Sequence, residues 1–235
     1  MAPKTWLIVG ASRGIGLGFV RQTLARGDRA IATVRKAGRP LEIVVQAFID
    51  RFAQTGQKKI DYVVVNAGIL EYPNRATEMT FDHFAHHLLT NTVGPIIVAQ
   101  KLLQLADVSV GTIAFMSSDS GSTQQFLSIE DGFPAYGASK AALNQALRHM
   151  TEELKRKKKD TIILALHPGE VATDMGKIEI SWDLDGGQIS AEESVSALIG
   201  VIESKTSEHT GTFWTWEGEV NFLNPPFRWC LDVGG

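Results

Sequence analysis

The stretch Thr5-Trp-Leu-Ile-Val-Gly10-Ala-Ser-Arg-Gly-Ile-Gly16 decides the fold of this chain. Thr5–Val9 reads as a short apolar strand, and a helix predicted over Gly14–Arg26 begins within the same stretch. Glycines between a strand and a helix let the backbone turn tightly, and the helix N-terminus presents free N–H groups with a positive partial charge. The stretch therefore predicts a site for a phosphate-containing ligand. A glycine-rich turn that binds nothing is the alternative interpretation.

Apolar strands alternate with helices along the rest of the chain. The strands are predicted at Arg29–Val34, Tyr62–Val65, Gly111–Met116, Thr161–Leu166 and Gly211–Trp214, and the helices at Leu41–Gln54, Thr80–Gln104, Pro134–Lys157 and Ser190–Ser204. Nearly continuous apolar strands separated by helices predict an α/β fold of Rossmann type, with a doubly wound parallel sheet. Since no repeat or linker interrupts the pattern, we expect one domain over residues 1–235.

Composition narrows the class of protein. The chain has 235 residues, a net charge of −3 and a single cysteine, Cys230. One cysteine excludes a disulfide framework within the chain and suits a reducing, cytoplasmic location. No apolar run reaches the roughly 18 residues that a membrane span requires. The mild acidity argues against nucleic acid as a partner. We expect a cytoplasmic protein that binds neither nucleic acid nor membrane.

The segment Tyr136-Gly-Ala-Ser-Lys140 carries a second signal. Tyr136 and Lys140 lie one helical turn apart, and a lysine ammonium near a phenol favours the phenolate. We therefore expect the pKa of Tyr136 to fall from about 10 towards neutrality. A tyrosine tuned in this way can donate or accept a proton at a carbonyl or an alcohol. Ser117-Ser118 and Asn66-Ala-Gly68 each follow another predicted strand, so that all the motifs meet at one edge of the sheet.

The end of the second predicted strand indicates which dinucleotide is bound. An NAD site places an acidic residue there to bind the ribose 2′-hydroxyl, whereas this chain has Thr33-Val-Arg-Lys36. Arg35, together with Arg13 in the glycine turn, suits a 2′-phosphate, because guanidinium groups bind phosphate through charge-assisted bonds. The sequence thus favours NADP(H) over NAD(H). Exposed loop charges are the alternative interpretation of Arg35.

Through these motifs taken together, the chain resembles the short-chain dehydrogenase/reductase family along its whole length. The likeness is greatest to the branch of sniffer-type carbonyl reductases and C-factor proteins, and it is carried by Gly10–Gly18, Asn91–Pro95, Met116–Ser118 and Leu166–Gly176. The resemblance implies an NADPH-dependent oxidoreductase that reduces a ketone or aldehyde, or oxidises the alcohol in reverse. It implies the catalytic set Asn91, Ser118, Tyr136 and Lys140.

Each member of this set has an implied role. Tyr136 would donate the proton, and Lys140 would lower its pKa and bind the nicotinamide ribose. Ser118, rather than Ser117, would orient the substrate carbonyl, and the backbone of Asn91 would anchor a proton-relay water. The resemblance also implies cofactor contacts from Gly10, Ser12, Arg13, Gly14, Ile15, Gly16, Arg35, Asn66, Ala67, Gly68, Tyr136, Lys140, Pro168, Gly169, Val171 and Thr173. No metal is expected.

One segment departs from the family pattern. The family fits a helix, a strand and another helix between the positions of Arg35 and Asn66, whereas this chain has room for the single helix Leu41–Gln54. We therefore expect the outer edge of the sheet to be truncated beyond the second strand and the adenine pocket to be more open. Two other functions stay open: a non-redox enzyme (a dehydratase or cyclisation catalyst), or a dinucleotide-binding signalling protein of C-factor type.

The substrate and the assembly are less sharply defined by the sequence. Asp174–Ile189 is expected to form a lid over the nicotinamide, and Trp182 within it favours a hydrophobic carbonyl or alcohol substrate. Pro134–Lys157 is expected to pair with its copy in a homodimer. The residues expected at that interface are Ala138, Ala141, Ala142, Leu143, Ala146, Leu147 and Met150. A tetramer is possible if the aromatic C-terminus makes a second contact through Phe222, Phe227 and Trp229.

Overall fold

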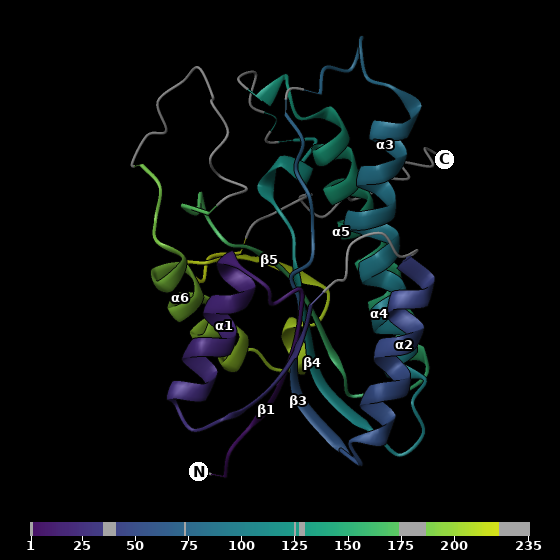
Figure 1. The fold of residues 1–235 in the computed structure, drawn as a ribbon, viewed down its shortest axis with the longest axis vertical. Coiled ribbons are helices and arrows are strands. Elements are labelled where there is room, and N and C mark those ends of the chain that lie inside the picture. The colour runs from purple at the N-terminus through teal and green to yellow at the C-terminus, as the bar shows by residue number, and fades with distance from the viewer. Residues whose placement is uncertain are drawn as a thin grey trace, which may run out of the picture.

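A computed structural model describes residues 2–34, 41–72, 74–124, 126, 130–173 and 187–220. Its centre is a single six-stranded sheet in which every neighbouring pair of strands is parallel, in the order β2-β1-β3-β4-β5-β6 (Figure 1). The strands are β1 (Thr5–Val9), β2 (Arg29–Thr33), β3 (Lys59–Val65), β4 (Ser109–Met116), β5 (Ile162–His167) and β6 (Thr212–Thr215). The parallel α/β architecture expected from the sequence is confirmed.

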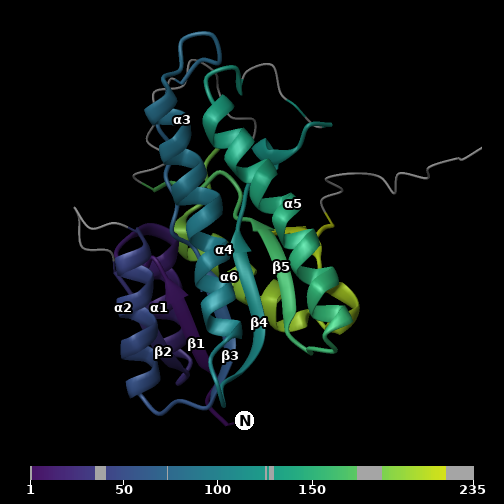
Figure 2. The same cartoon turned by 90° about the vertical axis from the view of Figure 1, so that its right-hand side faces the viewer.

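Helices cover both faces of the sheet. They are α1 (Gly14–Ala25), α2 (Leu41–Gln54), α3 (Phe81–Leu88), α4 (Gly94–Leu103), α5 (Pro134–Arg156) and α6 (Ala191–Ser204), with short helical turns η2 (Asp119–Gly121) and η4 (Ser207–His209). α1 and α6 lie side by side on one face, and α2, α4 and α5 lie on the other (Figures 1 and 2). The helical segment expected over Thr80–Gln104, with an interruption near Gly94-Pro95 left open, is divided by a π-helical turn, η1 (Leu89–Val93), into α3 and α4.

The strands read as continuous apolar runs because both faces of the sheet are buried. In β1, Leu7 packs into the core on the side of α2, α4 and α5, whereas Trp6 and Ile8 pack into the core on the side of α1 and α6. All three side chains are fully buried. Alternation along a strand sends neighbouring side chains to opposite faces, so a strand between two helix layers needs apolar residues at every position.

The sheet ends early on the side of β2. In the described part of the chain β2 pairs with β1 alone, and the chain returns through α2 across β1 to β3. Phe52 and Ile49 of α2 are buried in the same core as Val98 and Leu102 of α4. A single returning helix therefore stands where the family pattern has a helix, a strand and another helix. The truncated edge predicted from the sequence is confirmed.

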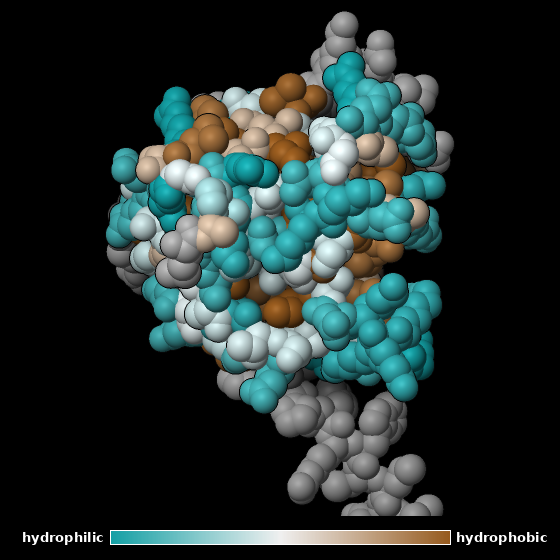
Figure 3. Space-filling view, turned by 90° about the horizontal axis from the view of Figure 1, so that it is seen from below, coloured by the Kyte–Doolittle hydropathy of each residue, from teal (hydrophilic) through white to brown (hydrophobic). Residues whose placement is uncertain are grey.

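The surface is mixed in character. Hydrophilic residues cover most of the face seen from below, and hydrophobic residues show between them and in a recess at one side (Figure 3). None of the helices among the described residues combines the length and the apolar character that crossing a membrane requires.

Candidate active site

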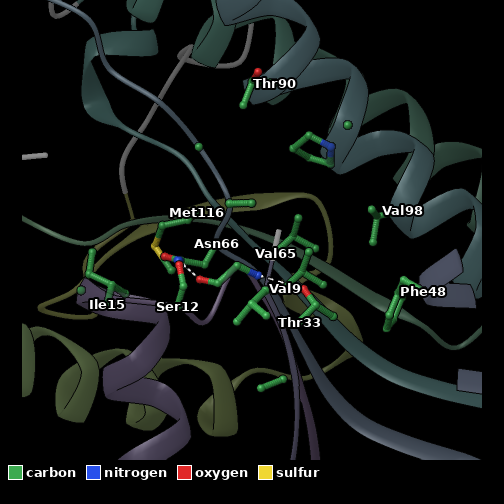
Figure 4. Close-up of a pocket in the computed structure, with 18 of the residues that line it drawn as sticks. Val9, Ser12, Ile15, Thr33, Phe48, Val65, Asn66, Thr90, Val98 and Met116 are labelled. Atoms are coloured by element: carbon green, nitrogen blue, oxygen red, sulfur yellow. Dashed lines mark hydrogen bonds between the residues drawn. The ribbon is translucent and has the colours of Figure 1, made fainter. Parts of the chain in front are cut away.

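The candidate site lies at the carboxyl ends of the strands, where parallel α/β sheets bind ligands. A cavity of about 730 Å³ extends there, lined by Tyr136 and Lys140 towards one end and by Phe48 and Arg51 of α2 towards the other. Figure 4 shows Ser12 and Ile15 of the glycine turn on one side of this cavity and Phe48 and Val98 on the opposite side. Its volume is in the range of about 300–1,000 Å³ that is typical of small-molecule and cofactor sites.

The glycine turn is held tightly against the two neighbouring strands. The backbone N–H of Gly10 donates to Thr33 Oγ1 over 3.1 Å, and Asn66 Nδ2 donates to the Gly10 carbonyl oxygen over 2.8 Å (Figure 4). A Cβ atom at Gly10 would lie 2.8 Å from Ala67 N, and one at Gly16 would lie 2.1 Å from the Gly10 carbonyl oxygen. Only glycine fits these two positions without moving the backbone.

The N-terminus of α1 suits a phosphate group. Arg13 at the N-cap makes no side-chain capping bond, and the first turn of α1 contains no acidic residue. The N–H groups of that turn therefore keep their positive partial charge towards the cavity, which Gly14 and Ile15 line. The narrow glycine turn, this helix end and the size of the cavity together fit a dinucleotide such as NADP(H).

The two serines that follow β4, Ser117 and Ser118, have different hydrogen-bond partners. Ser117 Oγ donates to Asn144 Oδ1 of α5 over 2.7 Å and is buried. Ser118 hydrogen-bonds to the phenol of Tyr136, and its hydroxyl also lies 3.1 Å from Asp119 Oδ1. Ser118 is therefore the serine beside the tyrosine, whereas Ser117 joins β4 to α5 and is the one of the two that lines the cavity.

Tyr136 and Lys140 lie on the first turns of α5, whose start is set by Pro134 at its first position. Lys140 Nζ lies 5.4 Å from the centroid of the Tyr136 ring and donates to the Met116 carbonyl oxygen over 2.9 Å. Burial lowers the pKa of Lys140 to about 8. An ammonium that is easily deprotonated is a weaker electrostatic partner than the sequence argument assumed.

The pKa of Tyr136 is raised, and our expectation that it would be lowered is wrong for this structure. Burial is the largest cause, and the charges of Asp119, Glu170 and Glu130 raise the pKa further, against the lowering effect of the hydrogen bond with Ser118. Tyr136 therefore stays a protonated phenol at neutral pH. The protonated form is the one that a proton donor needs.

Asn91 lies behind the tyrosine rather than in the cavity wall. It belongs to the π-helical turn η1 and is fully buried. Its Oδ1 accepts from the Ile69 N–H over 2.8 Å, and its Nδ2 donates to the Ile69 carbonyl oxygen over 2.9 Å and to Ser139 Oγ over 3.0 Å. Ser139 Oγ in turn donates to the Tyr136 carbonyl oxygen over 2.7 Å. Asn91 thus joins the segment after β3 to the first turn of α5.

An acidic group beside the tyrosine was missed by the sequence analysis. Asp119, His167 and Glu170 have ligand atoms within 4.8 Å of one another, and His167 Nδ1 lies 3.3 Å from Asp119 Oδ1. Burial, as the largest cause, raises the pKa of Glu170 and of Glu130, whose Oε1 accepts from Ser120 Oγ over 2.9 Å. Asp119 and Glu130 lie in the connection between β4 and α5, whereas His167 ends β5 and Glu170 follows it, so no single motif contains all of them.

The remaining predicted cofactor contacts divide into three groups. Among the described residues, the cavity is lined by Gly10, Ser12, Arg13, Gly14, Ile15, Asn66, Ala67, Gly68, Pro168 and Thr173, together with Tyr136 and Lys140. Gly16, Gly169 and Val171 are not among the residues that line it. Gly16 packs on Gly10, Gly169 lies against Trp216, and Val171 is buried and bridged to Ile189.

Other predicted residues lie outside the described part of the chain. These are Arg35, Trp182, Phe222, Phe227 and Trp229. The cavity is also lined by residues that were not among the predicted cofactor contacts, including Thr33, Thr90 and Met116. Thr33 could have been found, because it ends an apolar strand beside the glycine turn. Phe48 and Arg51 could not, because their place depends on how α2 returns across the sheet.

Comparison with known proteins agrees with this geometry. A family model described as short chain dehydrogenase matches residues 44–183, which is more than half of the chain. The chain therefore belongs to the short-chain dehydrogenase family. An uncharacterised oxidoreductase of Saccharomyces cerevisiae is 30% identical to it over an alignment 250 residues long, gaps included. The alignment covers 91% of this chain and 95% of the relative.

Two further proteins match the branch that the sequence motifs indicated. The C-signal protein of Myxococcus xanthus is 30% identical over 160 residues, which cover 68% of this chain and 90% of that protein. The crystal structure of NADPH-bound carbonyl reductase from chicken fatty liver superposes with a TM-score of 0.76 at 26% identity, covering 94% of this chain and 99% of the other. The chain is thus similar both to a carbonyl reductase and to the C-signal protein.

Proposed function

We propose that this short-chain dehydrogenase is an NADPH-dependent carbonyl reductase acting on a ketone or aldehyde. The observation that carries the proposal is that Tyr136, with Ser118 hydrogen-bonded to it, and Lys140 line one end of a cavity that continues past the glycine turn. When bound, a nicotinamide cofactor supplies the hydride that the protein itself cannot provide.

The chain's own residues handle the proton and the charge. Tyr136 holds its phenol proton at neutral pH and gives it to the substrate oxygen as negative charge develops there. The Ser118 hydroxyl, already hydrogen-bonded to that phenol, donates to the same oxygen. Asn91 and Ser139 fix the start of α5, on which Tyr136 depends for its position. In the opposite direction Tyr136 accepts the proton of an alcohol.

The choice of NADP(H) over NAD(H) rests on charge. β2 ends at Thr33 and Val34 follows it, where an acidic residue would be required to bind a free ribose 2′-hydroxyl. Arg13 lines the cavity at the same end of the glycine turn. The structurally similar chicken carbonyl reductase was crystallised with NADPH bound. A cytoplasmic location is part of the same proposal and depends on the single cysteine.

The direct test measures the loss of NADPH absorbance in the presence of a broad panel of aldehydes and ketones. We expect turnover with at least one apolar carbonyl compound and none with the Tyr136→Phe variant, which keeps the ring and removes the proton. Absence of turnover with every compound, for a protein that still binds NADPH, would reject carbonyl reduction.

The similarity to the C-signal protein favours a second candidate, a dinucleotide-binding signalling protein. Such a protein needs the glycine turn and has no use for the proton on Tyr136. A biological effect that survives in a Tyr136→Phe/Lys140→Ala double variant would favour signalling. Loss of the effect in that variant would favour the enzyme.

We also propose that the protein forms a homodimer through α5 and the α3–η1–α4 segment, which lie side by side in Figure 2. Leu89 and Val93, one turn apart on η1, are 53% and 42% exposed, and Ala142 and Ala146 of α5 are partly exposed. Leu143 and Leu147, which we expected at the interface, are instead buried in the core. A second copy of the chain would cover Leu89 and Val93.

A further inference from the structure

The cavity has a second arm that the catalytic residues do not reach. From the end of β2 it continues along that strand beneath α2, where Ile31, Phe48, Phe52 and Val98 line it. This space lies at the truncated edge of the sheet, where the chain lacks one strand and one helix of the expected pattern. The arm is continuous with the part of the cavity lined by Ser12 and Gly14. Whatever occupies the glycine turn can therefore extend into it.

Arg51 is a cation in the wall of this arm. It is the only basic residue of α2, it lines the cavity, and its side chain is exposed. No hydrogen bond or ion pair holds its guanidinium within the described ranges, whereas Gln46 and Asp50 of the same helix bind one another over 2.8 Å. An unpaired guanidinium in a cavity wall is available to a ligand.

The direction of α2 relative to the strands bears on where the Arg51 side chain points. α2 begins after β2 and runs back to β3, antiparallel to the strands, so its N-terminus lies at their carboxyl ends. Side chains on an α-helix point towards its N-terminus. The Cα–Cβ bond of Arg51 is therefore directed towards the end of α2 that lies at the carboxyl ends of the strands, and Thr33 and Val34 line the same cavity as Arg51.

We propose that α2 forms the adenosine subsite of the cofactor and that Arg51 binds its 2′-phosphate. The inference rests on the proposed binding of NADP(H). The pyrophosphate occupies the glycine turn, and the adenosine half extends past the end of β2 into the apolar arm beside Phe48. A guanidinium binds a phosphate through two parallel charge-assisted hydrogen bonds. The returning helix thus replaces the strand that the truncated sheet lacks.

Three features of the arm favour the adenosine half of NADP(H) as its occupant. Its floor is apolar, which suits a purine base, and its wall carries one unpaired positive charge, which suits a phosphate. It is continuous with the phosphate-binding turn and not a separate pocket. A ribose with a free 2′-hydroxyl would leave Arg51 without a partner, so the subsite discriminates between the two dinucleotides by charge.

The experiment uses fragments of the cofactor that lack the nicotinamide and cannot react. Binding of 2′,5′-ADP and of 5′-AMP is measured by calorimetry on the full chain, at one fixed salt concentration. The variants are Arg51→Ala and the control Arg21→Ala, an exposed arginine of α1 that does not line the cavity. Circular dichroism confirms that each variant is folded.

We expect Arg51→Ala to weaken 2′,5′-ADP binding by about 10- to 100-fold, the effect of losing a charge-assisted contact, and to change 5′-AMP binding by less than about twofold. Arg21→Ala should change neither. Equal losses for the two fragments, or no loss of 2′,5′-ADP binding, would overturn the assignment. Failure of carbonyl reduction with this binding pattern intact would reject the proposed reaction and leave the subsite standing.

Discussion

The Nζ atom of Lys140 donates a 2.9 Å hydrogen bond to the carbonyl oxygen of Met116, joining α5 to the end of β4. Only 5% of the lysine is exposed to solvent, and burial lowers its pKa from 10.5 to about 8. The folded protein therefore binds fewer protons than the unfolded chain between about pH 8 and 10.5. This residue costs stability at neutral pH, and the cost disappears as the pH rises through that window.

Replacing the lysine by a neutral side chain should expose this cost. We expect Lys140→Met to raise the free energy of unfolding at pH 7 by on the order of 1–3 kcal/mol, because no charge is then buried. Loss of the hydrogen bond to Met116 should offset about 1 kcal/mol of this gain. Urea denaturation at pH 7 and pH 10 checks the sign, because the advantage should shrink at the higher pH. A variant that is less stable than the parent at both values would show that the ammonium is accommodated without penalty.

The carboxylates around Tyr136 should control its titration. Asp119→Asn removes one of the negative charges that raise the pKa of the phenol, so this pKa falls. If alcohol oxidation needs the phenolate, its rate should reach half-maximum at a lower pH in Asp119→Asn than in the parent. The measurement is a pH–rate profile in the oxidation direction, with Glu208→Gln on η4 as a control. Identical profiles for all three proteins would show that Asp119 does not act on the proton transfer.

The two neighbouring serines should give opposite results. Ser118→Ala removes the hydroxyl beside the tyrosine, and we expect kcat to fall on the order of 100-fold with little change in the melting temperature. Ser117→Ala leaves Asn144, whose Nδ2 already lacks a partner among the described residues, without its other bond. It should cost about 1–3 kcal/mol of stability and leave the kcat of the folded enzyme nearly unchanged. The reverse pattern would assign the substrate contact to Ser117.

The dimer proposal can be tested with two exposed leucines. Leu89 on η1 and Leu24 on α1 are 53% and 54% exposed, and they lie on different helices that cover opposite faces of the sheet. We expect Leu89→Glu to yield a monomer by light scattering, because a carboxylate would be buried at the interface. Leu24→Glu should leave the dimer intact. A dimer that survives Leu89→Glu, or a parent protein that is already monomeric, would exclude this face.

Periodicity and motif spacing predicted the strands of the sheet, their parallel direction and the truncated edge, but not the order of the strands. A strand that is buried on both faces has apolar residues at consecutive positions, as Trp6, Leu7 and Ile8 show, and this pattern is visible in the sequence. The missing strand was visible as a shortage of residues between Arg35 and Asn66. The π-helical turn at Asn91 was not visible, because its cause is tertiary: the side chain bonds to Ile69 and Ser139, which lie far away in the sequence.

In the candidate site, too, features set by local sequence could be predicted and features set by tertiary packing could not. Ser118, Tyr136 and Lys140 could be placed because each follows a recognisable strand or begins a helix. The direction of the pKa shift of Tyr136 could not, since it depends on burial and on carboxylates from both the β4–α5 connection and the segment after β5. Leu143 and Leu147 were assigned to the wrong face of α5, because an apolar residue in a helix does not show whether it meets the sheet or another subunit.

The one-sided pairing of β2 has a consequence for the lifetime of the protein. An edge strand with one hydrogen-bonded neighbour is among the first parts of a sheet to open, and here it carries one wall of the arm beneath α2. A ligand that binds only the closed form lowers the population of the open one in proportion to its occupancy. Digestion by an added protease should therefore begin at this edge, and 2′,5′-ADP should slow it at concentrations that track its own dissociation constant.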